Sequence, residues 1–154
     1  MKNKLIPIIL MLFLTGCERK PLLDKLSGSK VTETITITEW GKWIPTHLVV
    51  KEGQTFTVTA TGKMSSYWND CPSCGICTFN PNGRSYSSGS DPNAFIPSEI
   101  PGVLVGRIGL TSANILKASY TGISPHDGLL ELGINSWSNM TFISGSYTVT
   151  ITAE

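Results

Sequence analysis

The sequence predicts an all-β protein, an antiparallel β-sandwich of about eight short strands. Several segments alternate apolar and polar residues with the period of two that half-buried strands show. Charged residues make up only 15% of the 154 residues, and the 15 glycines indicate many turns. No segment sustains the apolar period of a helix, so an all-β class is favoured over a mixed one.

The chain begins with a predicted signal peptide over residues 1–16. Lys2 and Lys4 precede a short apolar run, Leu5 to Leu14, which is shorter than the about 20 residues of a transmembrane helix. The sequence Leu14-Thr15-Gly16-Cys17 resembles the lipobox of bacterial lipoproteins. The resemblance implies cleavage before Cys17, a diacylglycerol on its sulfur and a third acyl chain on its amino group. The alternative is an ordinary signal peptide with an incidental cysteine.

Residues 17–30 are predicted to be the lipidated N-terminus and a linker, and residues 31–154 a single domain. Glu18 follows the lipidated position. In enteric lipoproteins an aspartate there retains the protein in the inner membrane, so its absence predicts an outer-membrane lipoprotein, on the periplasmic or the surface face.

The charge balance argues against two kinds of partner. Without residues 1–16, 10 lysines and arginines face 11 acidic residues, a net charge of −1 (10 − 11). This balance argues against nucleic acid and against an electrostatic membrane patch. The expected membrane link is therefore through the acyl chains on Cys17, which together anchor a protein stably.

The first half of the domain contains three predicted strands. Val31 to Thr38 alternates, with threonine on the face predicted to meet solvent. Thr46 to Val50 is a second candidate. Thr55 to Ala60 alternates again, and Gly62 is predicted to end it.

Residues Ser65 to Pro101 are irregular, with one short strand expected inside them, and regular strand signals return afterwards. In the last strand the alternation directs Tyr147, Val149 and Ile151 inward. The strands predicted in this half are Ile76–Phe79, Val103–Ile108, Ile115–Tyr120, Leu129–Ile134 and Ser146–Ile151.

Four segments, in order, resemble those of the galactophilic PA-I type bacterial lectins. Gly53 to Gly62 resembles an early strand, and Phe79-Asn80-Pro81-Asn82-Gly83 a W-G-P-x-G turn. Gly102 to Gly109 resembles G-A-L-V-x-K-I-G, and Ser144 to Val149 resembles the closing S-G-S-F-S-V. The resemblance implies a jelly-roll sandwich of the galactose-binding-domain type and carbohydrate binding.

The calcium site of that family is not retained in this sequence. Its loop reads N-D-x-P-G-x-Y-x-N-N, and Asn135 falls at the aspartate, Asn139 at a backbone ligand, and Phe142 and Ile143 at the two asparagines. Calcium needs about six to eight oxygen ligands. The H-P-x-Q sugar-contact segment also has no counterpart between residues 83 and 101. Calcium binding is therefore not expected.

Cys71, Cys74 and Cys77 remain after lipidation of the first cysteine, an odd number for an oxidising compartment. One local disulfide is expected, either Cys71–Cys77 or Cys74–Cys77. Cys71-Pro72-Ser73-Cys74 looks like a thioredoxin-type redox motif, but no helix is predicted to follow it. Three thiolates with His47 or His126 could also bind zinc. No metal or cofactor is assigned.

Aromatic residues near the same loops suggest a ligand site, because ring faces make good platforms for sugars. Packing against the core is the alternative for these rings, since tryptophan is usually buried. The candidate ligand-binding residues are Tyr67, Trp68, Trp137, Asn135, Asn139 and Phe142.

No catalytic residues are predicted. His126-Asp127 has no nucleophile motif beside it and is predicted to be a polar turn. The carboxylates show no pairing typical of glycoside hydrolysis. The predicted function is a lipid-anchored binding module, with glycan as the expected ligand. The rival is a structural or interaction lipoprotein of an envelope or secretion assembly, and the sequence names no protein partner.

Overall fold

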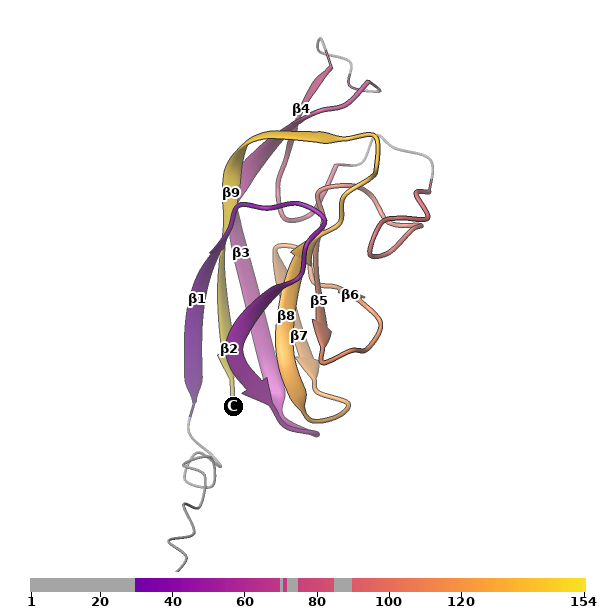
Figure 1. Cartoon of the computed structure of the whole chain (residues 1–154). Helices are drawn as coiled ribbons and strands as arrows, with labels where there is room; N and C mark the ends of the chain where they lie inside the picture. The colour runs from indigo at the N-terminus through magenta and orange to yellow at the C-terminus, as the bar shows by residue number, and fades with distance from the viewer. Residues whose placement is uncertain (1–29, 70, 72–74, 85–89) are drawn as a thin grey trace, which may run out of the picture.

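The computed structural model describes residues 30–69, 71, 75–84 and 90–154. This part of the chain confirms the predicted antiparallel β-sandwich, with two sheets and no helix (Figure 1). It therefore contains no helix long and apolar enough to span a membrane. The predicted signal peptide, and the predicted linker up to residue 29, lie outside the described residues. The strands are β1 (Val31–Ile37), β2 (Ile44–Val50), β3 (Thr55–Tyr67), β4 (Ile76–Phe79), β5 (Leu104–Ile108), β6 (Asn114–Ile115), β7 (Ser119–Ile123), β8 (Gly128–Ile134) and β9 (Thr141–Ala153).

The two sheets enclose one main core. The first sheet has the order β1-β9-β3-β4, and β7 pairs with β3 as well; the second has the order β2-β8-β5-β6. The described pairings are all antiparallel. Inward residues of both sheets pack together, which is the arrangement that alternating strands predict. The core includes Ile37, Val58, Leu132, Tyr147 and Ile151.

The outer face of the first sheet is rich in threonine, as the alternation of β1 predicts. Thr32 pairs with Thr152 and Thr34 with Thr150, and their hydroxyl oxygens lie 3.2 and 3.1 Å apart. Threonine suits this face because its β-branched chain fits a pleated surface and its hydroxyl bonds across strands.

The predicted end of a strand at Gly62 is wrong. β3 continues to Tyr67, and β9 starts at Thr141, five residues before the predicted Ser146. Gly62 has φ +111°, and a Cβ there would lie 2.3 Å from the backbone oxygen of Ser146. Glycine here permits a close approach between two long strands and does not end one.

The single strand predicted over Ile115–Tyr120 is also wrong. The segment forms β6 in one sheet and β7 in the other, separated by Lys117. Lys117 is the one non-glycine residue with positive φ (60°) among the described residues, and this left-handed turn carries the chain between the sheets.

The sandwich has two distinct ends (Figure 1). The tether end holds Lys30, which pairs with Glu154 at 2.7 Å, and the turn between β7 and β8. The disulfide end holds the connection from β3 to β4 and residues 135–140, which precede β9. β1 begins at the tether end, opposite the end that carries β4 (Figure 1).

Candidate functional site

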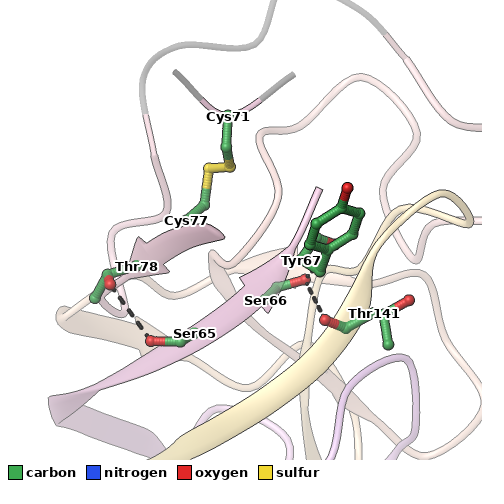
Figure 2. Close-up of a disulfide and its surroundings, with 7 residues drawn as sticks. All are labelled: Ser65, Ser66, Tyr67, Cys71, Cys77, Thr78 and Thr141. Atoms are coloured by element: carbon green, nitrogen blue, oxygen red, sulfur yellow. Dashed lines mark hydrogen bonds between the residues drawn. A yellow bond between two sulfur atoms is a disulfide. The ribbon is translucent and has the colours of Figure 1, made fainter. Parts of the chain in front are cut away.

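A disulfide joins Cys71 to Cys77 and confirms the expected local bridge (Figure 2). The Cα atoms of the two residues lie 5.7 Å apart. The structure thus selects one of the two pairings that the sequence left open, while Cys74 lies outside the described residues. With these two sulfurs bonded, three thiolates are not available together for zinc, and Cys71 is not free for a thioredoxin-type pair.

The two histidines considered as zinc ligands have other partners. The ring Nδ1 of His47 lies 2.9 Å from Oε1 of Glu33, and Nε2 of His126 lies 3.1 Å from the carbonyl oxygen of Ile108. Over the described part of the chain, histidine, cysteine and acidic side chains form no group of three suited to a metal.

Trp68 and Trp137 are buried, with 2% and 8% of their surface exposed. Their rings meet edge to face with centroids 5.6 Å apart, and Nε1 of Trp137 donates to the carbonyl oxygen of Glu99 at 3.2 Å. The pair forms a second core with Cys71, Cys77 and Phe79. This burial favours the packing alternative over ligand contact for both tryptophans.

Tyr67 and Phe142 are exposed, in contrast to the tryptophans. Tyr67 is 49% exposed, and its ring stands off β3 beside Thr141 of β9 (Figure 2). A Cβ on Gly75 would lie 2.5 Å from Cε2 of Tyr67, so the ring rests against a bare stretch of backbone. Ile76 and Ile143 are about half exposed at the same end. Tyr67 lies directly opposite Ile76, whereas Phe142 lies opposite Ser66, on the other face of the sheet, with its ring centroid 6.4 Å from that of Trp40. We call the four exposed residues at this end of the sheet the apolar rim: Tyr67, Ile76, Phe142 and Ile143.

Hydroxyl bonds fix the strands that carry the apolar rim. Oγ of Ser66 donates to the carbonyl oxygen of Thr141 at 2.8 Å, and the Oγ atoms of Ser65 and Thr78 lie 3.4 Å apart (Figure 2). These bonds link β3 to β9 and to β4, just below Tyr67. Together with the Cys71–Cys77 disulfide, these bonds fix the backbone that carries Tyr67.

Asn135 is fully buried and acts as a structural clamp. Its Oδ1 accepts from the backbone N–H of Ile96 at 3.0 Å. Its Nδ2 lies 3.2, 3.1 and 3.4 Å from the carbonyl oxygens of Ile96, Glu99 and Ile100. These contacts occupy the whole amide, which leaves none of it facing a ligand. Asn139, in the same loop, is exposed.

Asp91 also links the segment before Pro101 to the loop that precedes β9. Its carboxylate accepts hydrogen bonds from the backbone N–H of Ser138 and from that of Asn93 at 2.8 Å. These N–H groups hold the pKa of Asp91 below its usual range, since they favour the ionised form. This role could not be predicted from the sequence, because Asp91 is separated from Ser138 by 47 residues.

Aromatic rings stack on the outer face of the second sheet, a feature that the sequence did not predict. Trp43 stacks on Phe95 with centroids 4.1 Å apart, and the guanidinium of Arg107 lies 4.4 Å from the Trp43 ring centroid. Nε of Arg107 donates to Oε2 of Glu131 at 2.7 Å. Phe95 thereby attaches the segment before Pro101 to the sheet. Its ring lies over Gly133, where any larger side chain would collide with the ring.

Among the described residues, the disulfide end therefore carries exposed aromatic rings on strands that a disulfide and hydrogen bonds link. Its shape is set by a disulfide, a buried amide and a buried carboxylate, and it presents ring faces with the Asn139 amide nearby in sequence. Such a surface can stack against and hydrogen-bond a neutral ligand.

One solved structure with a similar fold is the N-terminal domain of EclA, a PllA-like lectin. The two are 18% identical with a TM-score of 0.52, over 80% of this chain and 95% of that one. At this identity the likeness shows the fold alone, a lectin-like β-sandwich. The narrower resemblance to the PA-I type stays a prediction. No protein-family description matches the sequence, and no curated protein matches it either.

Proposed function

We propose that this lectin-like sandwich is the carbohydrate-binding domain of an outer-membrane lipoprotein, without catalytic activity. Its glycan site is the apolar rim at the disulfide end, and its membrane link is the acylated Cys17. The half-exposed ring of Tyr67, supported from below by Gly75, is the observation that carries the proposal.

Tyr67 suits a sugar because it offers a fixed apolar face beside polar groups. Sugars carry apolar C–H patches that pack on aromatic rings, while their hydroxyls need hydrogen-bond partners. The disulfide and the strand bonds hold the backbone of Tyr67 before any ligand arrives, and Gly75 lies against one edge of its ring. Pre-organisation of this kind lowers the ordering cost, about 0.5–1.5 kcal/mol per immobilised side chain.

The binding we propose does not use calcium. The Asn135 amide, at the position of the family's aspartate, is already bonded to the backbone of residues 96–100. Phe142 and Ile143 present hydrocarbon where the family presents amide oxygens. A hard cation needs oxygen ligands, so this loop supports a calcium-free mode of binding.

A glycan array and a titration on the Tyr67→Ala variant test the site. The protein used begins at residue 18, since both sheets and both cores lie within residues 30–154. We expect binding that survives a calcium chelator and weakens by about tenfold or more in Tyr67→Ala, the equivalent of about 1.4 kcal/mol.

Leu110→Ala is the matched control, because Leu110 is 94% exposed and follows β5 at the tether end. It should leave glycan affinity unchanged. Equal glycan affinity of the wild type and Tyr67→Ala would show that the apolar rim is not the binding site. Loss of binding in the presence of the chelator would show that binding requires calcium.

Lipidation is tested by Cys17→Ser in the full chain. The wild-type protein should incorporate labelled palmitate and sediment with outer membranes, whereas Cys17→Ser should incorporate none. The reason is chemical, because the thioether to diacylglycerol requires the cysteine sulfur. Equal labelling of the two proteins would refute the anchor.

A protein-contact role is the second candidate function, favoured by the two exposed isoleucines in the apolar rim. Ile76 and Ile143 are 50% and 48% exposed, and Ile76 lies directly opposite Tyr67 in the sheet. Exposed apolar surface of this kind often marks protein interfaces. An array without any bound glycan, together with intact membrane anchoring, would favour this structural or interaction role.

A further inference from the structure

β4 forms one edge of the first sheet, and over the described residues it pairs with β3 alone. In an antiparallel pair only every second residue of a strand bonds to its neighbour. The backbone N–H of Trp68 donates to the carbonyl oxygen of Gly75 at 2.6 Å, so by the register of the two strands Cys77 also bonds to β3. The N–H and C=O groups of Ile76 and Thr78 therefore point away from β3, toward the unpaired side of the strand.

Three other edge strands carry features that hinder pairing with a further strand. Proteins commonly protect sheet edges by proline, bulges, very short strands or inward-pointing charges. β2 contains Pro45 and a shift in register between it and Val49, and β6 is two residues long. In β1 the carboxylate of Glu33 accepts from the backbone N–H of His47 in β2 at 2.9 Å. β4 has the sequence Ile76-Cys77-Thr78-Phe79, and it contains no proline, no charge and no shift in register.

The side chains of β4 leave its edge accessible. Ile76 is 50% exposed and Thr78 is also exposed, both on the outer face of the sheet. The alternate residues, Cys77 and Phe79, are buried on the inner face. Backbone donors and acceptors thus lie beside an exposed apolar side chain, which is the combination that strand addition uses.

We infer that the unpaired side of β4 pairs with β4 of a second copy of the chain, antiparallel and centred on Cys77. This register places Ile76 opposite Thr78 of the second copy, and Thr78 opposite its Ile76. Both residues carry outward N–H and C=O groups, so the two pairs exchange four hydrogen bonds. A register centred on Thr78 would need the carbonyl oxygen of Asn80, which already accepts from the N–H of Gly83 at 2.8 Å. The edge therefore matches itself in hydrogen bonding and brings no like charges together.

The proposed interface is small, so the dimer is expected to be weak. Four residues from each copy bury far less than the about 800 Å² per partner of a standard interface, and we expect a Kd on the order of 100 µM. Tyr67 lies on β3 and its ring stays outside the new ladder. The inference does not depend on the glycan proposal, and a failure of either leaves the other standing.

Sedimentation equilibrium tests the inference on the protein that begins at residue 18. Every sample carries Cys74→Ser, so that no disulfide through this cysteine joins two chains; this protein is the reference. It should show a monomer–dimer equilibrium between about 10 µM and about 1 mM. A protein that stays monomeric over this range would overturn the inference, whether the edge is then empty or pairs with a strand of another protein.

Amide hydrogen exchange followed by NMR identifies the strand that pairs. At a concentration about ten times the Kd, the N–H groups of Ile76 and Thr78 should exchange about fivefold more slowly than in the monomer, because about one fifth of the chains remain single. The N–H of Cys77 already bonds to β3 in a single copy, so its exchange should not change with concentration. Exchange at Ile76 and Thr78 that is independent of concentration would overturn the inference.

Thr78→Pro removes the outward N–H and leaves the bonds between Cys77 and β3 in place. It should raise the Kd of the dimer by about tenfold or more, because the lost hydrogen bond occurs twice in the symmetric pair. Thr78→Val is the matched control, since it keeps the N–H and removes only the hydroxyl group. The control should dimerise like the reference protein, and equal Kd values for the two variants would contradict the pairing.

Ile76→Lys tests the same edge without altering a backbone group, and it decides the matter if Thr78→Pro fails to fold. Ile76 is half exposed, so a lysine there leaves both cores intact. The dimer would bring the two lysines close together, and the Kd should rise by about tenfold or more. The melting temperature of the monomer should stay close to that of the reference protein. An unchanged Kd in Ile76→Lys would overturn the inference.

Discussion

Replacing Asn135 with aspartate lowers the free energy of unfolding by about 3–5 kcal/mol, the cost of a buried charge without a partner. The side chain is fully buried, and its Nδ2 faces three carbonyl oxygens, those of Ile96, Glu99 and Ile100. A carboxylate there has no N–H to donate and meets only acceptors on that side. Urea unfolding of Asn135→Asp at neutral pH measures the loss.

Asn139→Asp is the control, because it makes the same change on an exposed amide in the same loop. It should change stability by no more than about 0.5 kcal/mol. The penalty in Asn135→Asp should also shrink as the pH falls, since burial raises the pKa of a new carboxyl and the protonated form can donate again. Equal losses in both variants, or calcium-dependent recovery of Asn135→Asp, would contradict the clamp.

Trp137→Ala lowers the free energy of unfolding by about 3–5 kcal/mol, the usual cost of removing a large buried ring. Trp137 is 8% exposed and packs edge to face on Trp68. Its removal leaves a cavity in the second core and frees the carbonyl oxygen of Glu99 from one of its donors. Thermal and urea melts of the variant give the size of the effect.

Trp137→Phe separates packing from hydrogen bonding. It keeps a ring against Trp68 and loses the Nε1 donor, so a cost of about 1–2 kcal/mol is expected. If Trp137→Ala instead leaves stability unchanged and abolishes glycan binding, the ring contacts the ligand and the packing interpretation is wrong.

The faces of the strands could be predicted from the sequence because alternation is a local property. Phe56, Val58 and Ala60 are buried, as their spacing predicts. The lengths of the strands and the sheet to which each belongs could not be predicted, because they depend on which strand pairs with each segment. Gly62 reads as a strand end until its close contact with Ser146 is known, and the left-handed Lys117 carries no sequence signal.

The placement of the candidate residues at one end of the sandwich could be expected from the family resemblance, but their exposure could not. The sequence put aromatic rings and cysteines at one end, and the structure brings Tyr67, Trp68 and Trp137 there. Which ring is exposed depends on long-range packing that no local pattern encodes. The family resemblance aligned Asn135 with a metal-ligand position, whereas its actual partners lie 35 to 39 residues earlier in the chain.

The entry of the chain at β1 has a mechanical consequence. A load applied between Lys30 and Tyr67, at opposite ends of the sandwich, runs along the strands, from β1 to β9 and then to β3. Hydrogen bonds between antiparallel strands lie across that direction. The load therefore acts on all the hydrogen bonds between β1 and β9 at once, from the pair Val31–Ala153 to the pair Ile37–Tyr147. It does not break them one pair at a time. The resistance of the domain to pulling between these two points is set by the full length of β1.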